Sequence, residues 1–231
     1  MSETEFSGLN LSPRLLKIAR LLPKSKSLAD IGTDHAYIPV WALKNHITDF
    51  AVASDINKGP LERARENVLK SDLSEKVSLR IGPGLSTVTP GEAETIIIAG
   101  MGGILISDIL AAANDVVSEA KCLILQPMTA IKELREYISQ NSFTLTGEYL
   151  VREDEKIYTI IALVPGGKTT YTEKELILGK GLTSTSPELF DAYKAQIVKK
   201  YQTKLRGLLK SILDENLRTA EEVKRILDLI S

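Results

Sequence analysis

The chain has 231 residues, of which 43% are hydrophobic and 26% charged, and its 29 basic and 30 acidic side chains give a formal net charge of −1. It is too apolar for a disordered chain and too mixed for a fibrous one, and no run reaches the roughly 18–20 apolar residues of a membrane-spanning helix. The start, MSETEFSGLN, is acidic and polar and does not resemble a secretory signal. One cysteine, Cys122, and two histidines exclude a disulfide framework and make a structural zinc cluster unexpected. We therefore expect a globular, cytoplasmic protein with no metal and no membrane association.

Charge is distributed unevenly along the chain. Residues 1–165 carry 17 basic and 21 acidic side chains, whereas residues 166–231 carry 12 basic and 9 acidic ones. The change falls at Pro165-Gly166-Gly167-Lys168, a composition typical of a linker. We place a domain boundary there, between a domain of residues 1–165 and an appendage of residues 166–231.

The first domain alternates short apolar runs with segments of helical length. It opens with an expected helix over residues 11–22, with Ser12 as its cap and Pro13 after it. Five nearly continuous apolar runs predict strands that are covered on both faces: residues 27–33, 50–56, 77–81, 95–99 and 122–125. Segments between and after them predict helices: residues 37–45, 60–70, 103–114 and 130–141. This alternation is typical of a doubly wound parallel α/β sheet.

The end of the first domain departs from this alternation. Two strand-like runs, residues 143–151 and 157–164, are joined by five residues, so they predict an antiparallel hairpin. A parallel sheet finished by such a hairpin differs from that of a dinucleotide dehydrogenase and is associated with S-adenosylmethionine-dependent methyltransferases. We therefore predict an α/β, class I methyltransferase-like (Rossmann-like) fold with a seven-stranded sheet.

The appendage is expected to be helical. Apolar residues recur every three or four positions from Leu189 to Ile212, and again from Ala220 to Ile230. The sequence Ser186-Pro187-Glu188 predicts a helix start, and Glu215-Asn216 predicts a break. The pattern indicates a C-terminal helical hairpin or coiled coil.

The strongest local signal, Asp30-Ile31-Gly32-Thr33-Asp34-His35, lies where the first strand meets the first helix of the sheet. Ligands of open α/β sheets bind at the carboxyl ends of strands, and Gly32 lets the backbone approach a ligand without a Cβ in the way. Asp30 and Asp34 would repel a pyrophosphate and attract a sulfonium that carries an ammonium group. The loop therefore favours S-adenosylmethionine over NAD; a tight turn capped by Asp34 is the alternative interpretation.

Four later loops extend this site. Asp55 ends the second strand, 25 residues after Asp30, where an acid can accept hydrogen bonds from ribose hydroxyls, although a turn or cap residue fits too. At Gly82-Pro83-Gly84 a proline stands where many such enzymes carry an adenine-binding acid, so backbone groups would recognise adenine, or the segment is a plain turn. At Gly100-Met101-Gly102-Gly103 the three glycines suggest close approach of a ligand. Gln126, at the end of the fifth strand, is expected to hydrogen-bond either a base or the neighbouring loop.

Together, DIGTDHAY (30–37), SDINKGP (54–60), IAGMGG (98–103) and LILQP (123–127) resemble the bacterial tRNA (adenine-N1)-methyltransferase family that modifies position 22 of tRNA. The similarity spans residues 9–165, and the helical tail agrees with the family's C-terminal appendage. The resemblance implies S-adenosylmethionine as the methyl donor, N1 of an adenine as the acceptor, and tRNA as the partner of a cytoplasmic enzyme. By motif position, the residues expected around the cofactor are Asp30, Gly32, Asp34, His35, Asp55, Ile56, Gly82, Gly100 and Met101.

The acceptor determines the expected mechanism. Adenine N1 carries a free lone pair at pH 7, so catalysis requires alignment of N1 with the sulfonium methyl rather than removal of a proton. Because N1 lies on the Watson–Crick edge, the base must be unpaired and drawn into the pocket. A carboxylate would stabilise the cationic product. Asp34 is our catalytic candidate; its alternative role is to bind the methionine ammonium group.

Two stretches hold basic residues without acidic ones and are candidates for phosphate binding, with a solvated helix face as the alternative for each. They contain five basic residues between Phe6 and Ala29, and six from Lys194 to Lys210. The residues expected to bind the tRNA substrate are Arg14, Lys17, Lys199, Lys200 and Lys204. The N-terminal helix is also a candidate lid over the cofactor, with Arg14 facing it.

Two other functions compete with tRNA methylation. One is a small-molecule S-adenosylmethionine-dependent methyltransferase whose helical tail serves dimerisation, and the other is a non-catalytic interaction protein that keeps the fold. Removal of residues 168–231 is expected to abolish tRNA methylation but to spare a small substrate. The sequence leaves the oligomeric state open, a monomer included.

Overall fold

The computed structural model describes residues 11–210 and 214–231. The strands are β1 (Ser25–Ile31), β2 (Thr48–Asp55), β3 (Val77–Ile81), β4 (Thr95–Gly102), β5 (Cys122–Thr129), β6 (Phe143–Glu153) and β7 (Lys156–Pro165). The helices of the sheet domain are α1 (Pro13–Leu21), α2 (Tyr37–Lys44), α3 (Lys58–Lys70), the short 3₁₀ helix η1 (Gly84–Thr87), α4 (Gly103–Ala112), α5 (Asn114–Glu119) and α6 (Ile131–Gln140). Those of the appendage are α7 (Glu173–Leu178), α8 (Leu182–Thr185), α9 (Pro187–Leu208) and α10 (Asp214–Ile230). The polar N-terminal decapeptide and Ile212, both used above, lie outside the described residues.

The strands form one sheet in the order β3-β2-β1-β4-β5-β7-β6. The pairs from β3 to β5 are parallel, whereas β7 runs antiparallel to both β5 and β6. The predicted seven-stranded sheet with a terminal antiparallel hairpin is thus confirmed. Strand order reverses between β1 and β4, which makes the carboxyl ends of these two strands the expected ligand site.

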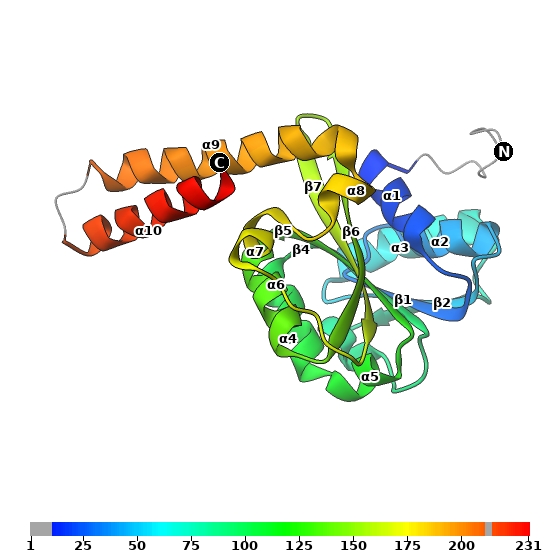
Figure 1. Cartoon of the computed structure of the whole chain (residues 1–231). Helices are drawn as coiled ribbons and strands as arrows, with labels where there is room; N and C mark the ends of the chain where they lie inside the picture. The colour runs from blue at the N-terminus through cyan, green and yellow to red at the C-terminus, as the bar shows by residue number, and fades with distance from the viewer. Residues whose placement is uncertain (1–10, 211–213) are drawn as a thin grey trace.

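Helices cover both faces of the sheet (Figure 1). Residues of α1, α2 and α3, among them Ile18 and Trp41, pack against one face. Residues of α4, α5 and α6 pack against the other. On β4, Ile97 joins the first cluster while Ile96 and Ile98 join the second. This alternation explains why the strand is a continuous apolar run.

Two helix predictions need correction. The helix expected over residues 103–114 is divided, because Ala113 leaves helical geometry with φ −135° and a new helix begins at Asn114. The break predicted at Glu215-Asn216 is wrong, since α10 begins at Asp214 and includes both residues. Acidic residues and Asn are favoured at helix N-termini, where they complement exposed N–H groups and the helix dipole. The polar cluster therefore marks a helix start.

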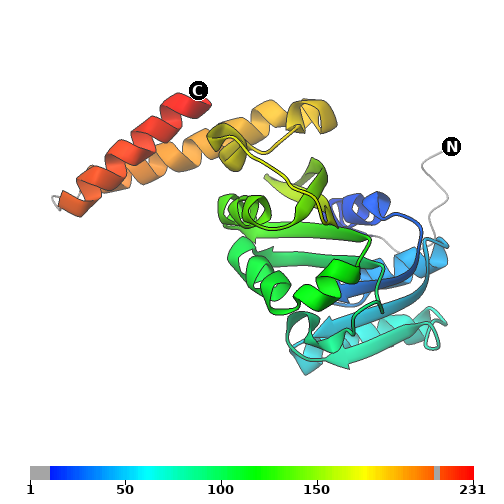
Figure 2. The ribbon, with the colours of Figure 1, turned by 60° about the horizontal axis from the view of Figure 1, so that its bottom comes forward.

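The helices α9 and α10 form a hairpin that projects away from the sheet domain (Figures 1 and 2). Its buried residues Ile226 and Ile230 on α10 share a cluster with Ile197 and Tyr201 on α9. The expected helical hairpin is therefore present.

A buried ion pair within the sheet domain also contacts the start of the appendage. Arg135 on α6 and Glu148 on β6 are both fully buried, with 2.7 Å between Nη2 and Oε2. Burial alone would lower the pKa of the Arg135 guanidinium, but its attraction to Glu148 raises it above the ordinary value. Arg135 Nη1 also donates to the carbonyls of Leu176 and Ile177 on α7, at 3.1 Å each. Although α7 thus packs on the sheet domain, the boundary drawn at residue 165 stays a prediction.

Candidate active site

A cavity of about 300 Å³ opens where β1 and β4 end. It brings together six of the residues singled out from the sequence: Arg14, Asp30, Gly32, Asp34, His35 and Gly100. Leu15, Tyr37 and Ile38 from α1 and α2 also line it. The cavity therefore lies at the reversal of strand order, with α1 as part of its wall.

The loop after β1 is held in an unusual backbone shape. The N–H groups of Gly32 and Thr33 both donate to the carbonyl of Ser54, at 2.8 and 2.9 Å. Gly32, His35 and Ala36 all have positive φ, at 76°, 65° and 51°. Left-handed geometry is unfavourable for residues with a Cβ, and such strain concentrates at functional sites. Two strained residues in succession here support a ligand-binding role for the loop.

Asp30 is the buried acid of this cavity. It is 7% exposed, and its Oδ2 accepts a hydrogen bond from the Thr33 hydroxyl at 2.6 Å. Desolvation by burial raises the pKa of Asp30 from 3.8 to about 6, although the Thr33 hydrogen bond opposes the shift. A desolvated carboxylate of this kind is stabilised by a cationic ligand. The Asp30 carboxylate is therefore suited to bind an ammonium or sulfonium group.

Asp34 lies at the exposed rim and is paired with a cation of the protein. Its Oδ1 accepts from Arg63 Nε at 3.0 Å and from Arg63 Nη2 at 2.8 Å. His35 Nε2 lies 3.6 Å from the same oxygen, and the His35 ring stacks on Tyr37 with centroids 4.9 Å apart. Arg63 was not among the site residues expected from the sequence. The only feature that could have indicated it was the high density of charged residues on α3. A ligand cation at Asp34 would therefore share the carboxylate with Arg63.

Gln126 connects the glycine-rich segment at the end of β4, residues 100–103, to α1. Its Oε1 accepts from Gly100 N at 3.2 Å and from Arg14 Nη1 at 2.7 Å. Arg14 is fixed from a second side because its backbone N–H donates to Glu153 Oε2 at 2.9 Å. Of the two roles left open for Gln126, the structure shows the contact with the neighbouring loop. These two hydrogen bonds hold Arg14 at the wall of the cavity. From the sequence, Arg14 was expected to face the cofactor from a lid formed by the N-terminal helix.

The Met101 side chain lies so close to Gly32 that only glycine fits at position 32 without a shift. A Cβ built at Gly32 would overlap the methyl group of the Met101 side chain. The loop after β1 and the end of β4 therefore pack directly on each other. The absence of a side chain at Gly32 permits that contact as well as the approach of a ligand.

Asp55, Ile56 and Gly82 lie at the adjacent strand ends, outside the cavity wall. The Asp55 carbonyl accepts from Gly82 N at 3.1 Å, and its Oδ1 accepts from Asn57 N at 2.7 Å. Asp55 thus makes a turn contact, as its alternative interpretation expected, and its other carboxylate oxygen accepts no hydrogen bond from the residues that the structure describes. Ile56 and Ile81 are 64% and 54% exposed. Both are exposed apolar side chains at neighbouring strand ends, since Asp55 pairs with Ile81, and Ile81 was missed because it was treated only as a strand residue.

The predicted tRNA-binding residues occupy two places. Lys199, Lys200 and Lys204 are exposed on α9. Arg14 and Lys17 on α1 lie over the rings of Tyr158 and Tyr149, with 5.6 and 5.1 Å to the centroids. The two groups are on separate helices that both contact β6.

Over residues 11–210 and 214–231, no three His, Cys, Asp or Glu side chains gather into a group that could hold a metal ion. None of the helices described there combines the length and the apolar character that crossing a bilayer requires.

Comparison with known proteins agrees with this geometry. Residues 11–161 match the model of a family described as "Methyltransferase domain". The tRNA (adenine(22)-N(1))-methyltransferase of Bacillus subtilis is 40% identical over 160 residues, which is 69% of this chain and 67% of the relative.

Two solved structures extend the match over nearly the whole chain. The crystal structure of the B. subtilis M1A22 tRNA methyltransferase TrmK superposes with a TM-score of 0.80 at 31% identity, covering 96% of this chain and 98% of that one. M. capricolum TrmK, in complex with S-adenosyl-homocysteine, gives 0.81 at 27% identity over 95% and 96% of the two chains. Together with the family match and the sequence identity, these likenesses show that the chain belongs to the tRNA (adenine(22)-N(1))-methyltransferase family.

Proposed function

We propose that this protein transfers the methyl group of S-adenosylmethionine to N1 of adenine 22 in tRNA. The observation that carries the proposal is Asp30, a desolvated carboxylate at the reversal of strand order, beside two glycines with left-handed backbone, Gly32 and Gly100. This site favours a small cationic ligand. The name of the B. subtilis relative supplies the reaction and the nucleotide, and the S-adenosyl-homocysteine bound to M. capricolum TrmK supports S-adenosylmethionine as the methyl donor.

The residues present fit the cofactor. Asp30 offers a carboxylate to the ammonium group, and Gly32 and Gly100 leave main chain open on either side of it. His35 and Asp34 lie at the rim, and Met101 contacts Gly32 from the end of β4. At the adjacent strand ends, Asp55 is available to ribose hydroxyls, with Ile56 and Gly82 beside it. When bound, S-adenosylmethionine supplies a sulfonium methyl group.

The chain's own part in catalysis is to position the acceptor and stabilise charge. Adenine N1 attacks with its lone pair, so no group is needed to remove a proton, and alignment supplies the rate enhancement. The methylated adenine is cationic, and a fixed carboxylate stabilises it as the charge develops. We assign this role to Asp34, whose pairing with Arg63 holds its Oδ1 in place.

The same proposal covers the partner and the compartment. The tRNA contacts are assigned to Arg14, Lys17, Lys199, Lys200 and Lys204, and the site of action to the cytoplasm. A small-molecule methyltransferase with a dimerising tail is disfavoured, because the structural match to the B. subtilis M1A22 tRNA methyltransferase covers 96% of this chain and so extends over the appendage.

The test is methylation of unmodified tRNA with labelled S-adenosylmethionine, followed by mapping of the modified nucleotide. We expect label at N1 of adenine 22 and none in a matched tRNA with guanine at that position. Label at another nucleotide, or transfer only to small molecules, would contradict the proposal.

A further inference from the structure

We propose that a groove between α9 and the β5–α6 corner binds unpaired nucleotides of the tRNA next to the target adenine. This inference rests on the proposed function and names the surface on which the substrate strand lies. The groove has a volume of about 510 Å³ and is formed by residues of α9 on one side and by residues 128–133 on the other. It is distinct from the cavity that contains Asp30, with which it shares no lining residue.

The inner surface of the groove is apolar and aromatic. Met128, 40% exposed, and Ile131 come from the β5–α6 corner. Tyr193 lies at the base, 3% exposed, and its hydroxyl is 3.4 Å from that of Thr159. Tyr201 is half-buried and lies about two helical turns further along α9. Aromatic rings are the surfaces on which unpaired bases stack, and Tyr201 is the ring of this groove that is accessible enough to serve.

The rim of the groove is basic. Lys200 and Lys204 lie exposed on the α9 side, one turn apart, and Lys132 lies on the opposite side, 3.2 Å from Glu136. Glu133 is the acidic residue among the lining residues. Even with Lys132 paired to Glu136, Lys200 and Lys204 face the single carboxylate of Glu133, and such an excess of positive charge complements a phosphate backbone. A groove with an aromatic floor and a positively charged rim therefore favours single-stranded RNA over an apolar protein helix.

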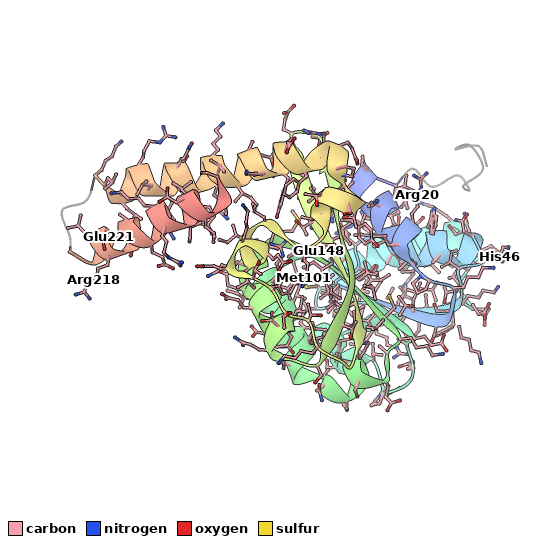
Figure 3. The ribbon with its side chains drawn as sticks, viewed as in Figure 1. Arg20, His46, Met101, Glu148, Arg218 and Glu221 are labelled. Carbon is pink, nitrogen blue, oxygen red and sulfur yellow. The ribbon has the colours of Figure 1, made fainter. Side chains whose placement is uncertain are left out.

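The end of β5 connects the groove to the glycine-rich segment beside the site of methyl transfer. Thr129, in the groove, pairs with Gly102 of the glycine-rich segment. Gln126 makes the same connection, because its Nε2 lies 3.5 Å from the Met128 sulfur while its Oε1 accepts from Gly100 N. Figure 3 shows that the far end of the appendage, marked by Arg218, lies well away from Met101. The part of the appendage connected to this segment is therefore the stretch of α9 that lines the groove together with Thr129.

The first test is fluorescence of a Tyr201→Trp variant titrated with unmodified tRNA. Trp41 is the only tryptophan and is 3% exposed, so the parent protein supplies the background signal. We expect quenching by tRNA and by single-stranded RNA, and none by a poly-glutamate peptide. Quenching by the peptide alone, or no quenching by RNA that demonstrably binds, would overturn the proposal.

The second test is the salt dependence of tRNA affinity. Each lost phosphate contact lowers the slope of log affinity against log salt by about 1, so Lys200→Glu/Lys204→Glu should lower it by about 2. The control Lys224→Glu makes the same type of substitution at one exposed position on α10 outside the groove, and the slope should stay unchanged. Tyr201→Ala should weaken tRNA binding about 10-fold, whereas Tyr201→Phe keeps the ring and the affinity. S-adenosylmethionine affinity should not change in any of these variants.

The outcomes separate this proposal from the proposed function. If the parent methylates adenine 22 and the Lys200→Glu/Lys204→Glu protein matches Lys224→Glu in its salt slope, the groove is not the strand site and the enzymatic function stands. If Tyr201→Trp is quenched by tRNA but the parent transfers no methyl group to it, the groove stands and the reaction is wrong.

Discussion

Replacing Asp30 by Asn should stabilise the protein while it weakens the cofactor site. Asp30 is fully desolvated, and burial raises its pKa from 3.8 to about 6. The folded protein therefore binds more protons than the unfolded chain between pH 4 and 6, and stability falls as pH rises through that window. At pH 7 the ionised carboxylate costs about 3 kcal/mol, which Asp30→Asn removes while an amide oxygen still accepts from Thr33.

The stability assay is thermal unfolding without cofactor at pH 7 and at pH 4. For a chain of this size, about 3 kcal/mol corresponds to a rise of roughly 6–12 °C in Tm. We expect Asp30→Asn to show that rise at pH 7 and little of it at pH 4, where the buried carboxyl of the folded protein is protonated and carries no charge. A variant that is less stable than the parent at pH 7 would refute the assignment of a desolvated, destabilising carboxylate.

The binding assay is calorimetric titration with S-adenosylmethionine between pH 5 and 8. A cation beside Asp30 favours its ionised form, so parent affinity should fall by up to about 10-fold per pH unit below pH 6. Asp30→Asn should bind weakly at every pH and lose this dependence. His35, in the same cavity, is present in both proteins, so the difference between the two profiles belongs to Asp30. Equal affinity of the two proteins at pH 8 would remove Asp30 from the cofactor site.

Two further substitutions test packing around the site. Glu148→Gln leaves the Arg135 guanidinium buried without its counter-charge, so the free energy of unfolding in urea should drop by about 3–5 kcal/mol. Gly32→Ala places a Cβ against the Met101 methyl at φ +76°, and should both lower the Tm and abolish measurable S-adenosylmethionine binding.

Each has a matched control in the same chain. Glu136→Gln removes the half-exposed partner of Lys132 and should change stability by less than about 1 kcal/mol. Gly91→Ala meets the same φ of +76° with no atom within 4 Å, so it should carry only the backbone strain and leave cofactor affinity intact. Equal effects of test and control substitutions would contradict the roles given to the buried pair and to the Gly32 contact.

The sequence was sufficient for the sheet because burial on both faces makes each parallel strand a short apolar run. The loop after β1 was also predictable, since its acids and Gly32 are contiguous. These features depend on local pattern, which a single sequence displays directly.

The polar partners of the site were not predictable, because they join residues far apart in the chain. Arg14 meets Gln126 across 112 positions, and Arg63 meets Asp34 across 29. The pairing of a basic residue with its acceptor depends on helix rotation and strand register. Neither can be read from the composition of the chain. The buried Arg135 was missed for the same reason: its α6 pattern resembles an ordinary amphipathic helix.

The hairpin of β6 and β7 explains why deleting the appendage is a poor test of tRNA binding. The appendage is anchored to it, since Ser186 Oγ accepts from Leu150 N at 2.8 Å and Tyr193 meets Thr159. Removal of residues 168–231 would also take away the α7 carbonyls to which Arg135 donates. Exposing a buried ion pair and its surroundings should lower the free energy of unfolding by several kcal/mol, on the order of the loss from breaking the pair itself. We therefore expect the truncated chain to lose methylation of any substrate through instability, measurable as a lower urea midpoint. A truncated chain with the parent's urea midpoint would show instead that the sheet domain folds independently of the appendage.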